Sequence, residues 1–286
     1  MLSNKVSEIM TREVITAPAS SMIFDVMALM AARKVGAVVI TDNRAPAGIF
    51  TEHDVVRRVM NKKWDPKKTG IKRVMTSPVR AVPQDTHIIE ALGKMYHGRF
   101  RHLLIRGEKG IMVGMVSMRD ILKLAARLGQ GLTETQTIGT IMSGNIVTVD
   151  ALQSIYHTVE TMVEENTGCI VVLSGGEPKG IFTERDVVKR VAVRDVETKK
   201  VPIQEVMTTP VVSMDHSALV GEVLAEMYRR DFRNMLIRGD KRELAGIVSM
   251  GDVLKYARAL DIDDSVRRAW KEVEEFWESE EHYTPG

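Results

Sequence analysis

The sequence predicts an α/β (α+β) protein made of four copies of one small unit, arranged as a duplicated pair. Two long segments carry this prediction. Residues 48–59 (GIFTEHDVVRRV) return as residues 180–191 (GIFTERDVVKRV), with ten of twelve positions identical at an offset of 132. Residues 100–109 (FRHLLIRGEK) return at the same offset as 232–241 (FRNMLIRGDK). Self-similarity at a fixed period is typical of a repeat architecture, so the second half of the chain copies the first.

A shorter period of 66 residues divides each half in two. Glycines, hydroxyl residues and acids share this spacing: Gly48, Gly114, Gly180, Gly246; Thr51, Ser117, Thr183, Ser249; Asp54, Asp120, Asp186, Asp252. A methionine also recurs near the start of each unit: Met10, Met75, Met142, Met207. We therefore expect four units at 3–60, 69–126, 136–192 and 201–258, followed by a C-terminal helical tail at 262–286.

Each unit is predicted to have the order β–α–β–β–α. A short β-prone stretch, such as 79–82, follows the methionine. Apolar residues spaced by three and four then predict an amphipathic helix, as at Ile23, Val26, Met27 and Met30. Two apolar runs separated by turn residues, AVVITD and AGIF in the first unit, predict two strands. A closing helix begins at the hydroxyl residue.

One unit of ~55 residues buries too little surface to be comfortably stable alone, so we expect the units to pair. Helix faces left uncovered on each pair favour a disc-like assembly, closed within one chain or through a homodimer. Linkers are expected at 61–70, 127–137 and 192–202.

The composition excludes several classes of protein. Apolar residues make up 44% and charged residues 27% of the chain, which is typical of a soluble globular protein. No apolar run approaches the ~20 residues of a membrane span, and the first residues lack a signal-peptide layout. Cys169 is the single cysteine, and its apolar run predicts a core position. We expect a cytoplasmic protein with no membrane partner, and a net charge of +2 makes nucleic acid an unfavourable partner.

The recurrent Ser/Thr-x-x-Asp motif has two interpretations. The spacing is that of a capping box, in which the hydroxyl caps the helix and the acid reaches back. The same helix start offers free N–H groups and a positive dipole end to a phosphate, while the acid can accept hydrogen bonds from ribose hydroxyls. The residues alone favour capping.

The unit, with Met-Thr/Ser near its start and Gly-φ-φ-Ser/Thr-x-x-Asp near its end (φ apolar), resembles the CBS domain over residues 3–258. The two pairs are similar to tandem Bateman modules, the layout of the γ subunit of AMP-activated kinase. The resemblance implies ribose binding by the four motif acids, Asp54, Asp120, Asp186, Asp252. It implies phosphate near the four hydroxyl residues, Thr51, Ser117, Thr183, Ser249. It also implies an adenine lined by apolar residues, of which Val14, Val79, Ile146 and Val211 are candidates.

Basic residues distinguish the even units from the odd ones. The even units carry Arg101-His102 and Arg233-Asn234 where the odd units carry Gly36-Ala37 and Gly168-Cys169. The resemblance implies that a basic residue here faces the cleft between paired units and meets the phosphates, a role for which the forked, permanently charged arginine is suited. The motif itself adds three basic candidates for phosphate binding, His53, Arg119 and Arg185. The alternative is that these are surface arginines.

The resulting expectation is a regulatory module that binds and senses AMP, ADP or ATP and acts on an unknown partner. We expect no catalytic residue, metal or catalytic cofactor, because neither a zinc pattern nor a nucleophile motif is present. One alternative is S-adenosylmethionine or a related nucleoside in the same clefts. Another is a structural scaffold or nucleic-acid-associated protein, suggested by basic pairs in the linkers.

Overall fold

The computed structural model of the chain describes residues 5–62, 64–121, 123, 136–194 and 196–253. The helical tail expected at 262–286 lies outside these residues. Among the described helices none is both long and apolar enough to span a bilayer.

The structure confirms the predicted fold class, with one three-stranded sheet in each of four units. Unit 1 contains η1 (Val6–Glu8), β1 (Thr16–Pro18), α1 (Ile23–Arg33), β2 (Ala37–Asp42), β3 (Ala45–Thr51), α2 (Glu52–Asp54) and η2 (Val55–Met60). Unit 2 contains η3 (Ile71–Arg73), β4 (Ala81–Pro83), α3 (Ile88–His97), β5 (His102–Arg106), η4 (Glu108–Gly110) and β6 (Met112–Ser117). Unit 3 contains η5 (Ile138–Thr140), β7 (Thr148–Asp150), α5 (Ile155–Glu164), β8 (Cys169–Ser174), β9 (Glu177–Thr183), α6 (Glu184–Asp186) and η6 (Val187–Ala192). Unit 4 contains η7 (Ile203–Glu205), β10 (Ser213–Asp215), α7 (Val220–Arg229), β11 (Asn234–Arg238) and β12 (Leu244–Ser249).

The four sheets share one topology. In unit 1, β1 pairs in parallel with β2, which requires a crossover, and α1 provides it. Strand β2 then pairs antiparallel with β3 across a short turn, with a register shift after Ile40. The predicted apolar face of α1 is confirmed, because Ile23, Val26, Met27 and Met30 are all buried. Cys169 is also buried, as predicted.

The start of each unit packs on the other unit of its pair. Val6 of η1 lies in the core of unit 2, and Ile71 of η3 lies in the core of unit 1. Thr11 and Met115 exchange backbone hydrogen bonds between units 1 and 2, and Ile181 and Thr208 do so between units 3 and 4. Units 1 and 2 therefore form one module (module A), and units 3 and 4 form a second (module B).

The repeating methionine and glycine form one contact in this exchange. Met10 lies against Gly114, and Met142 lies against Gly246, where an added Cβ would stand 2.6 and 2.5 Å from the sulfur atoms. Met75 and Met207 make the same contact with Gly48 and Gly180. Glycine is required at these positions because a backbone segment from the other unit of the pair passes over the strand at close range.

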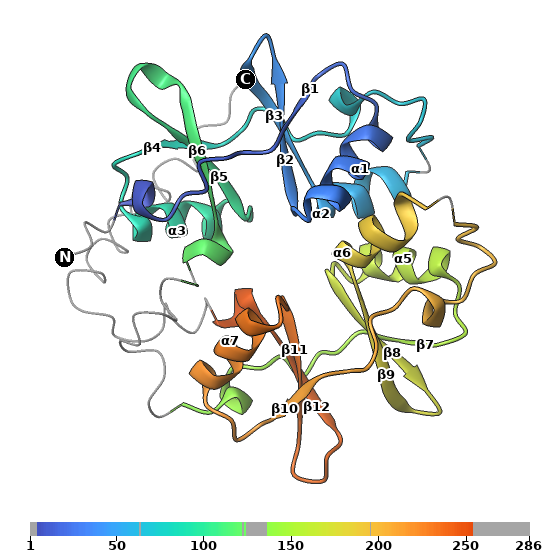
Figure 1. The fold of residues 1–286 in the computed structure, drawn as a ribbon. Helices are drawn as coiled ribbons and strands as arrows, with labels where there is room; N and C mark the ends of the chain where they lie inside the picture. The colour runs from blue at the N-terminus through green and yellow to red at the C-terminus, as the bar shows by residue number, and fades with distance from the viewer. Residues whose placement is uncertain (1–4, 63, 122, 124–135, 195, 254–286) are drawn as a thin grey trace, which may run out of the picture.

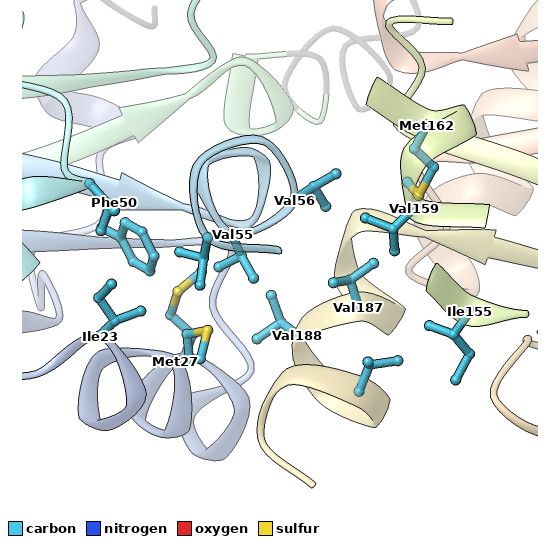
Figure 2. Packing of buried hydrophobic residues seen from close by; sticks show 14 of the residues in the cluster. Ile23, Met27, Phe50, Val55, Val56, Ile155, Val159, Met162, Val187 and Val188 are labelled. Atoms are coloured by element: carbon cyan, nitrogen blue, oxygen red, sulfur yellow. The ribbon is translucent and has the colours of Figure 1, made fainter. Parts of the chain in front are cut away.

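Helices of the odd units join the two modules (Figure 1). One buried cluster contains residues of both unit 1 and unit 3. Val56 of η2 and Val187 and Val188 of η6 lie between the cores of these units (Figure 2). On the opposite side, Tyr228 Oη donates to the Arg119 carbonyl at 3.2 Å, which links units 4 and 2. The four units thus form a closed ring within one chain.

Candidate functional site

The four Ser/Thr-x-x-Asp motifs form capping boxes, as the residues alone favoured. Thr51 N–H and Oγ1–H both donate to Asp54 Oδ2, at 2.9 and 2.7 Å, and Asp54 N–H donates to Thr51 Oγ1 at 3.3 Å. The same three bonds recur between Thr183 and Asp186. They recur in units 2 and 4 between Ser117 and Asp120 and between Ser249 and Asp252. Each motif thus holds a carboxylate at the start of a helical turn.

The second carboxylate oxygen is used in the odd units. Thr208 Oγ1 donates to Asp186 Oδ1 at 3.0 Å, and Arg190 Nε lies 3.5 Å from the same oxygen. Asp54 makes the equivalent contacts with Thr76 at 3.4 Å and Arg58 at 3.3 Å. In contrast, Asp120 Oδ1 accepts no hydrogen bond from any described residue, since both bonds to this carboxylate reach Oδ2.

A cavity of about 690 Å³ lies at the centre of the ring and is lined by residues of all four units. This volume is within the usual range of small-molecule sites. Two of the predicted acids, Asp120 and Asp186, line it together with Ser117, Thr183 and Ser249. Thr51, Asp54 and Asp252 are not among the lining residues.

Two of the four residues predicted to line an adenine are at this cavity. Val14 belongs to the start of unit 1, which lies beside β6 and the Asp120 motif of unit 2. Val211 belongs to the start of unit 4, which lies beside β9 and the Asp186 motif of unit 3. Val79 and Ile146 do not line the cavity. The structure therefore brings together one acid and one apolar candidate from each module.

The basic residues predicted to bind phosphate gather at the same place, except that His53 is not among the lining residues. The others at the cavity are Arg101, His102, Arg119, Arg185, Arg233. The arginines and His53 contact acidic side chains in this structure. Arg101 Nη2 donates to Glu184 Oε2 at 2.8 Å, and His53 Nδ1 lies 2.7 Å from Glu184 Oε1.

The remaining arginines pair with two other acids. Arg233 contacts Glu52, and Arg185 Nε lies 3.6 Å from the same carboxylate. Arg185 Nη1 also donates to Asp231 at 2.7 Å, and Arg119 contacts Asp231 too. The cationic groups predicted for a phosphate are therefore paired with carboxylates of the protein itself.

Sequence reasoning missed the two glutamates at the centre of this cluster. Glu52 and Glu184 occupy the second position of the motif in the odd units and are only 3% and 5% exposed. Met118 and Met250 occupy that position in the even units. One sequence signal could have identified them. Glu in the odd units alternates with Met in the even units, just as glycine alternates with arginine before the first long strand.

Burial and charge set the protonation of two groups in the cluster. Burial acts to raise the pKa of Glu184, but the His53 hydrogen bond and the charge of Arg101 outweigh it and lower the pKa to about 2. Burial, reinforced by Arg101 and Arg233, lowers the pKa of His102 to about 3. His102 is therefore neutral near pH 7 and can offer a phosphate a hydrogen bond but no charge.

The glycine–arginine alternation has a direct explanation in space. A Cβ at Gly36 would lie 2.5 Å from Arg233 Nη2 and 3.3 Å from Glu52 Oε2. Gly36 of unit 1 therefore leaves room for Arg233, which crosses the ring from unit 4, whereas the atoms nearest to a Cβ at Gly168 belong to Glu184, the closest at 3.3 Å. Within the described residues, no group of three or more His, Cys, Asp or Glu side chains is placed to hold a metal ion.

Known proteins resemble this chain in sequence and in fold. The family model of the CBS domain matches residues 6–61, 71–127, 138–193 and 203–259. The CBS domain-containing protein CBSCBSPB1 of Arabidopsis thaliana is 24% identical over 274 residues, which cover 82% of this chain and 50% of that protein. The uncharacterized protein MJ1404 of Methanocaldococcus jannaschii is 25% identical over 270 residues, covering 90% and 62%.

The chain spans about half the length of the plant relatives that it matches. Among solved structures, protein MJ1225 of Methanocaldococcus jannaschii, which its description proposes as an archaeal homologue of g-AMPK, superposes with a TM-score of 0.76. That match has 17% sequence identity and covers 88% of this chain and 99% of the other, so it establishes a shared four-unit fold.

Proposed function

Because this chain belongs to the CBS-domain family, we propose that it is a regulatory module that binds and senses AMP, ADP or ATP in its central cavity. CBS domains are generally regulatory modules that bind adenosine ligands, and proteins made of them alone are generally not catalytic. The observation that carries the proposal is the cavity itself, whose lining includes two of the predicted motif acids, two of the predicted apolar residues and four of the predicted arginines, drawn from both modules. The proposal includes no catalytic step.

The chemistry of the lining suits a nucleotide. A carboxylate at Asp120 or Asp186 can accept hydrogen bonds from the two vicinal hydroxyls of a ribose. Val14 and Val211 offer apolar surface to a base, and the helical turns after Ser117 and Thr183 begin beside the place where a phosphate would lie. The lining contains eight Lys or Arg residues and six Asp or Glu residues, so its net charge favours an anion.

A ligand in this cavity would contact both modules, which gives a physical basis for regulation. Binding then favours the arrangement of modules that contacts the ligand best. The shift in the equilibrium can be no larger than the difference in ligand affinity between the two arrangements. We propose that a partner protein reads this arrangement.

Calorimetric titration of the full chain with AMP, ADP and ATP tests the proposal. Asp186→Asn removes the charged acceptor for ribose, and we expect it to weaken nucleotide binding at that site by about tenfold or more. Asp54→Asn is a matched comparison, because Asp54 has the same contacts but does not line the cavity. We expect it to leave binding in the cavity unchanged while altering stability by a similar amount.

Two outcomes would contradict the proposal. One is the absence of binding by all three nucleotides to folded protein. The other is an unchanged affinity in the Asp120→Asn/Asp186→Asn double variant. An effect of Asp54→Asn equal to that of Asp186→Asn would move the site away from the central cavity.

The pairing of the arginines with acids favours a second candidate, S-adenosylmethionine or a related nucleoside. Such a ligand has adenine and ribose but no phosphate, so it would not have to displace Glu52 or Glu184 from their arginines. Competition between AMP and S-adenosylmethionine, in wild type and Arg101→Gln, distinguishes the two. Loss of AMP binding alone supports the nucleotide, whereas tight S-adenosylmethionine binding that survives the substitution supports the second candidate.

A further inference from the structure

The two buried glutamates connect the modules diagonally across the ring. Glu184 of unit 3 contacts Arg101 of unit 2, and Glu52 of unit 1 contacts Arg233 of unit 4. Each ion pair therefore joins module A to module B. Each also involves an arginine that lines the central cavity.

These two carboxylates form ion pairs with the arginines that an anionic ligand in the cavity would bind. A phosphate in the cavity would seek arginine donors, because a guanidinium binds phosphate and carboxylate with the same fork of N–H groups. In the structure, Arg101 and Arg233 donate hydrogen bonds to Glu184 and Glu52. A phosphate and a glutamate thus compete for the same donors.

Because both glutamates are buried, the loss of an arginine partner costs them free energy. Glu52 and Glu184 are almost fully excluded from solvent. A buried carboxylate that loses a cationic partner is strongly destabilised, because little water reaches it to replace the lost contact. After Arg101 turns toward a phosphate, Glu184 retains only His53 among its described ion-pair partners. Glu52 in the same way retains Arg185.

We propose that Glu52 and Glu184 are specificity-determining residues of this site, internal anions that a phosphate-bearing ligand must displace from Arg101 and Arg233. This inference rests on the proposed nucleotide function. The two glutamates lower the affinity for phosphate-bearing ligands and leave the affinity for an uncharged nucleoside unchanged. Because both pairs cross between modules, their displacement by phosphate also alters the contact between module A and module B.

The test compares Glu184→Gln and Glu52→Gln with wild type. Glutamine keeps the size of the side chain and an oxygen that accepts from arginine, but removes the negative charge. Asp42→Asn is the matched control, because it removes the same charge from an exposed ion pair with Lys72 that is outside the cavity. Three probes are titrated calorimetrically into each full-length protein: AMP, adenosine and inorganic phosphate.

We expect each glutamine variant to bind AMP and inorganic phosphate about tenfold more tightly than wild type, with adenosine affinity unchanged. Asp42→Asn should bind all three probes as wild type does. Thermal unfolding of every variant shows which proteins are folded, and because the two glutamates occupy equivalent positions, either variant suffices if the other fails to fold.

Three results would overturn the inference. AMP affinity that stays the same or falls in both variants would show that the glutamates do not compete with phosphate. An equal change for AMP and adenosine would show that they only shape the cavity. If no protein binds AMP or inorganic phosphate, the inference fails together with the proposed function. Tighter inorganic phosphate binding in the variants without any AMP binding would retain the inference and reject the nucleotide.

Discussion

Replacing Gly114 with alanine tests the contact through which unit 1 packs on unit 2. The new Cβ would lie 2.6 Å from Met10 Sδ and 3.0 Å from the Thr11 carbonyl oxygen, whereas ordinary contacts begin near 3.4 Å. The sulfur can move, because methionine is flexible. The Thr11 carbonyl cannot move freely, because it accepts a 2.9 Å hydrogen bond from the Met115 N–H in the bridge that joins the two units.

The expected cost follows from these distances. Adding a methyl group to a well-packed position costs typically 1–3 kcal/mol, and removal of a glycine returns about 0.4–1 kcal/mol by restricting the unfolded chain. We therefore expect a net loss of about 1–2 kcal/mol in the free energy of unfolding. For a chain of this size that loss lowers the unfolding midpoint by a few degrees.

Thermal unfolding followed by far-UV circular dichroism measures the effect. Gly70→Ala is the control, because no atom lies within 4 Å of its added Cβ and its φ of −71° suits alanine. We expect that variant to be as stable as wild type or slightly more stable. A Gly114→Ala protein at least as stable as Gly70→Ala would refute the reasoning and show that the contact between Met10 and Gly114 is loosely packed.

Three further predictions concern buried groups. The depressed pKa of Glu184, about 2 against an ordinary 4.5, stabilises the fold above pH 4.5, and this stabilisation is lost as the pH falls toward 2. The unfolding midpoint of wild type should therefore fall more steeply between about pH 5 and 2 than that of Glu184→Gln, and parallel curves would contradict this assignment. Burial raises the pKa of the Cys169 thiol, so we expect slow reaction with a thiol reagent at pH 8 in folded protein and one rapid equivalent in denaturant. Phe50→Ala and Phe182→Ala remove equivalent, fully buried rings, and urea unfolding should show losses of about 3–5 kcal/mol for each, with a loss below about 1 kcal/mol indicating a core that repacks.

Periodicity predicted most of the fold because each unit obeys local rules. The spacing of Ile23, Val26, Met27 and Met30 predicted both helix α1 and its buried face. Alternating apolar runs and turn residues predicted β2 and β3. These features depend on residues that are close in the sequence, and a repeated unit shows the same pattern several times.

Contacts between units were not predictable in the same way. An apolar helix face indicates burial but not the surface that covers it, so the packing of η2 against η6 required the structure. The packing of the first residues of each unit on the other unit of its pair was also not predicted, although the recurrent Met and Gly residues are the ones that make this contact. At the site, the motif acids and arginines were found from spacing, whereas Glu52 and Glu184 were missed because a glutamate after a hydroxyl residue is an ordinary choice in the first turn of a helix.

The two ion pairs that join the modules are related by the two-fold symmetry of the ring. Shifting every residue by 132 positions converts the pair Glu52–Arg233 into the pair Glu184–Arg101, since unit 4 then corresponds to unit 2. The contact between modules is therefore isologous, the arrangement found at the interface of a two-fold symmetric dimer. An odd-unit glutamate and an even-unit arginine on the same module make that surface complementary to itself, because rotation brings each glutamate onto the opposite arginine.

The departures from this symmetry distinguish the two sides of the ring. The same shift converts Arg185 into His53, Arg119 into Gly251 and Asp231 into Arg99. Arg185, Arg119 and Asp231 form one ion-pair group beside the Asp120 and Asp186 motifs, and those two motifs are the ones that line the cavity. The duplicated chain thus carries distinct residues on one side of a symmetric frame, which a homodimer of single modules could not do.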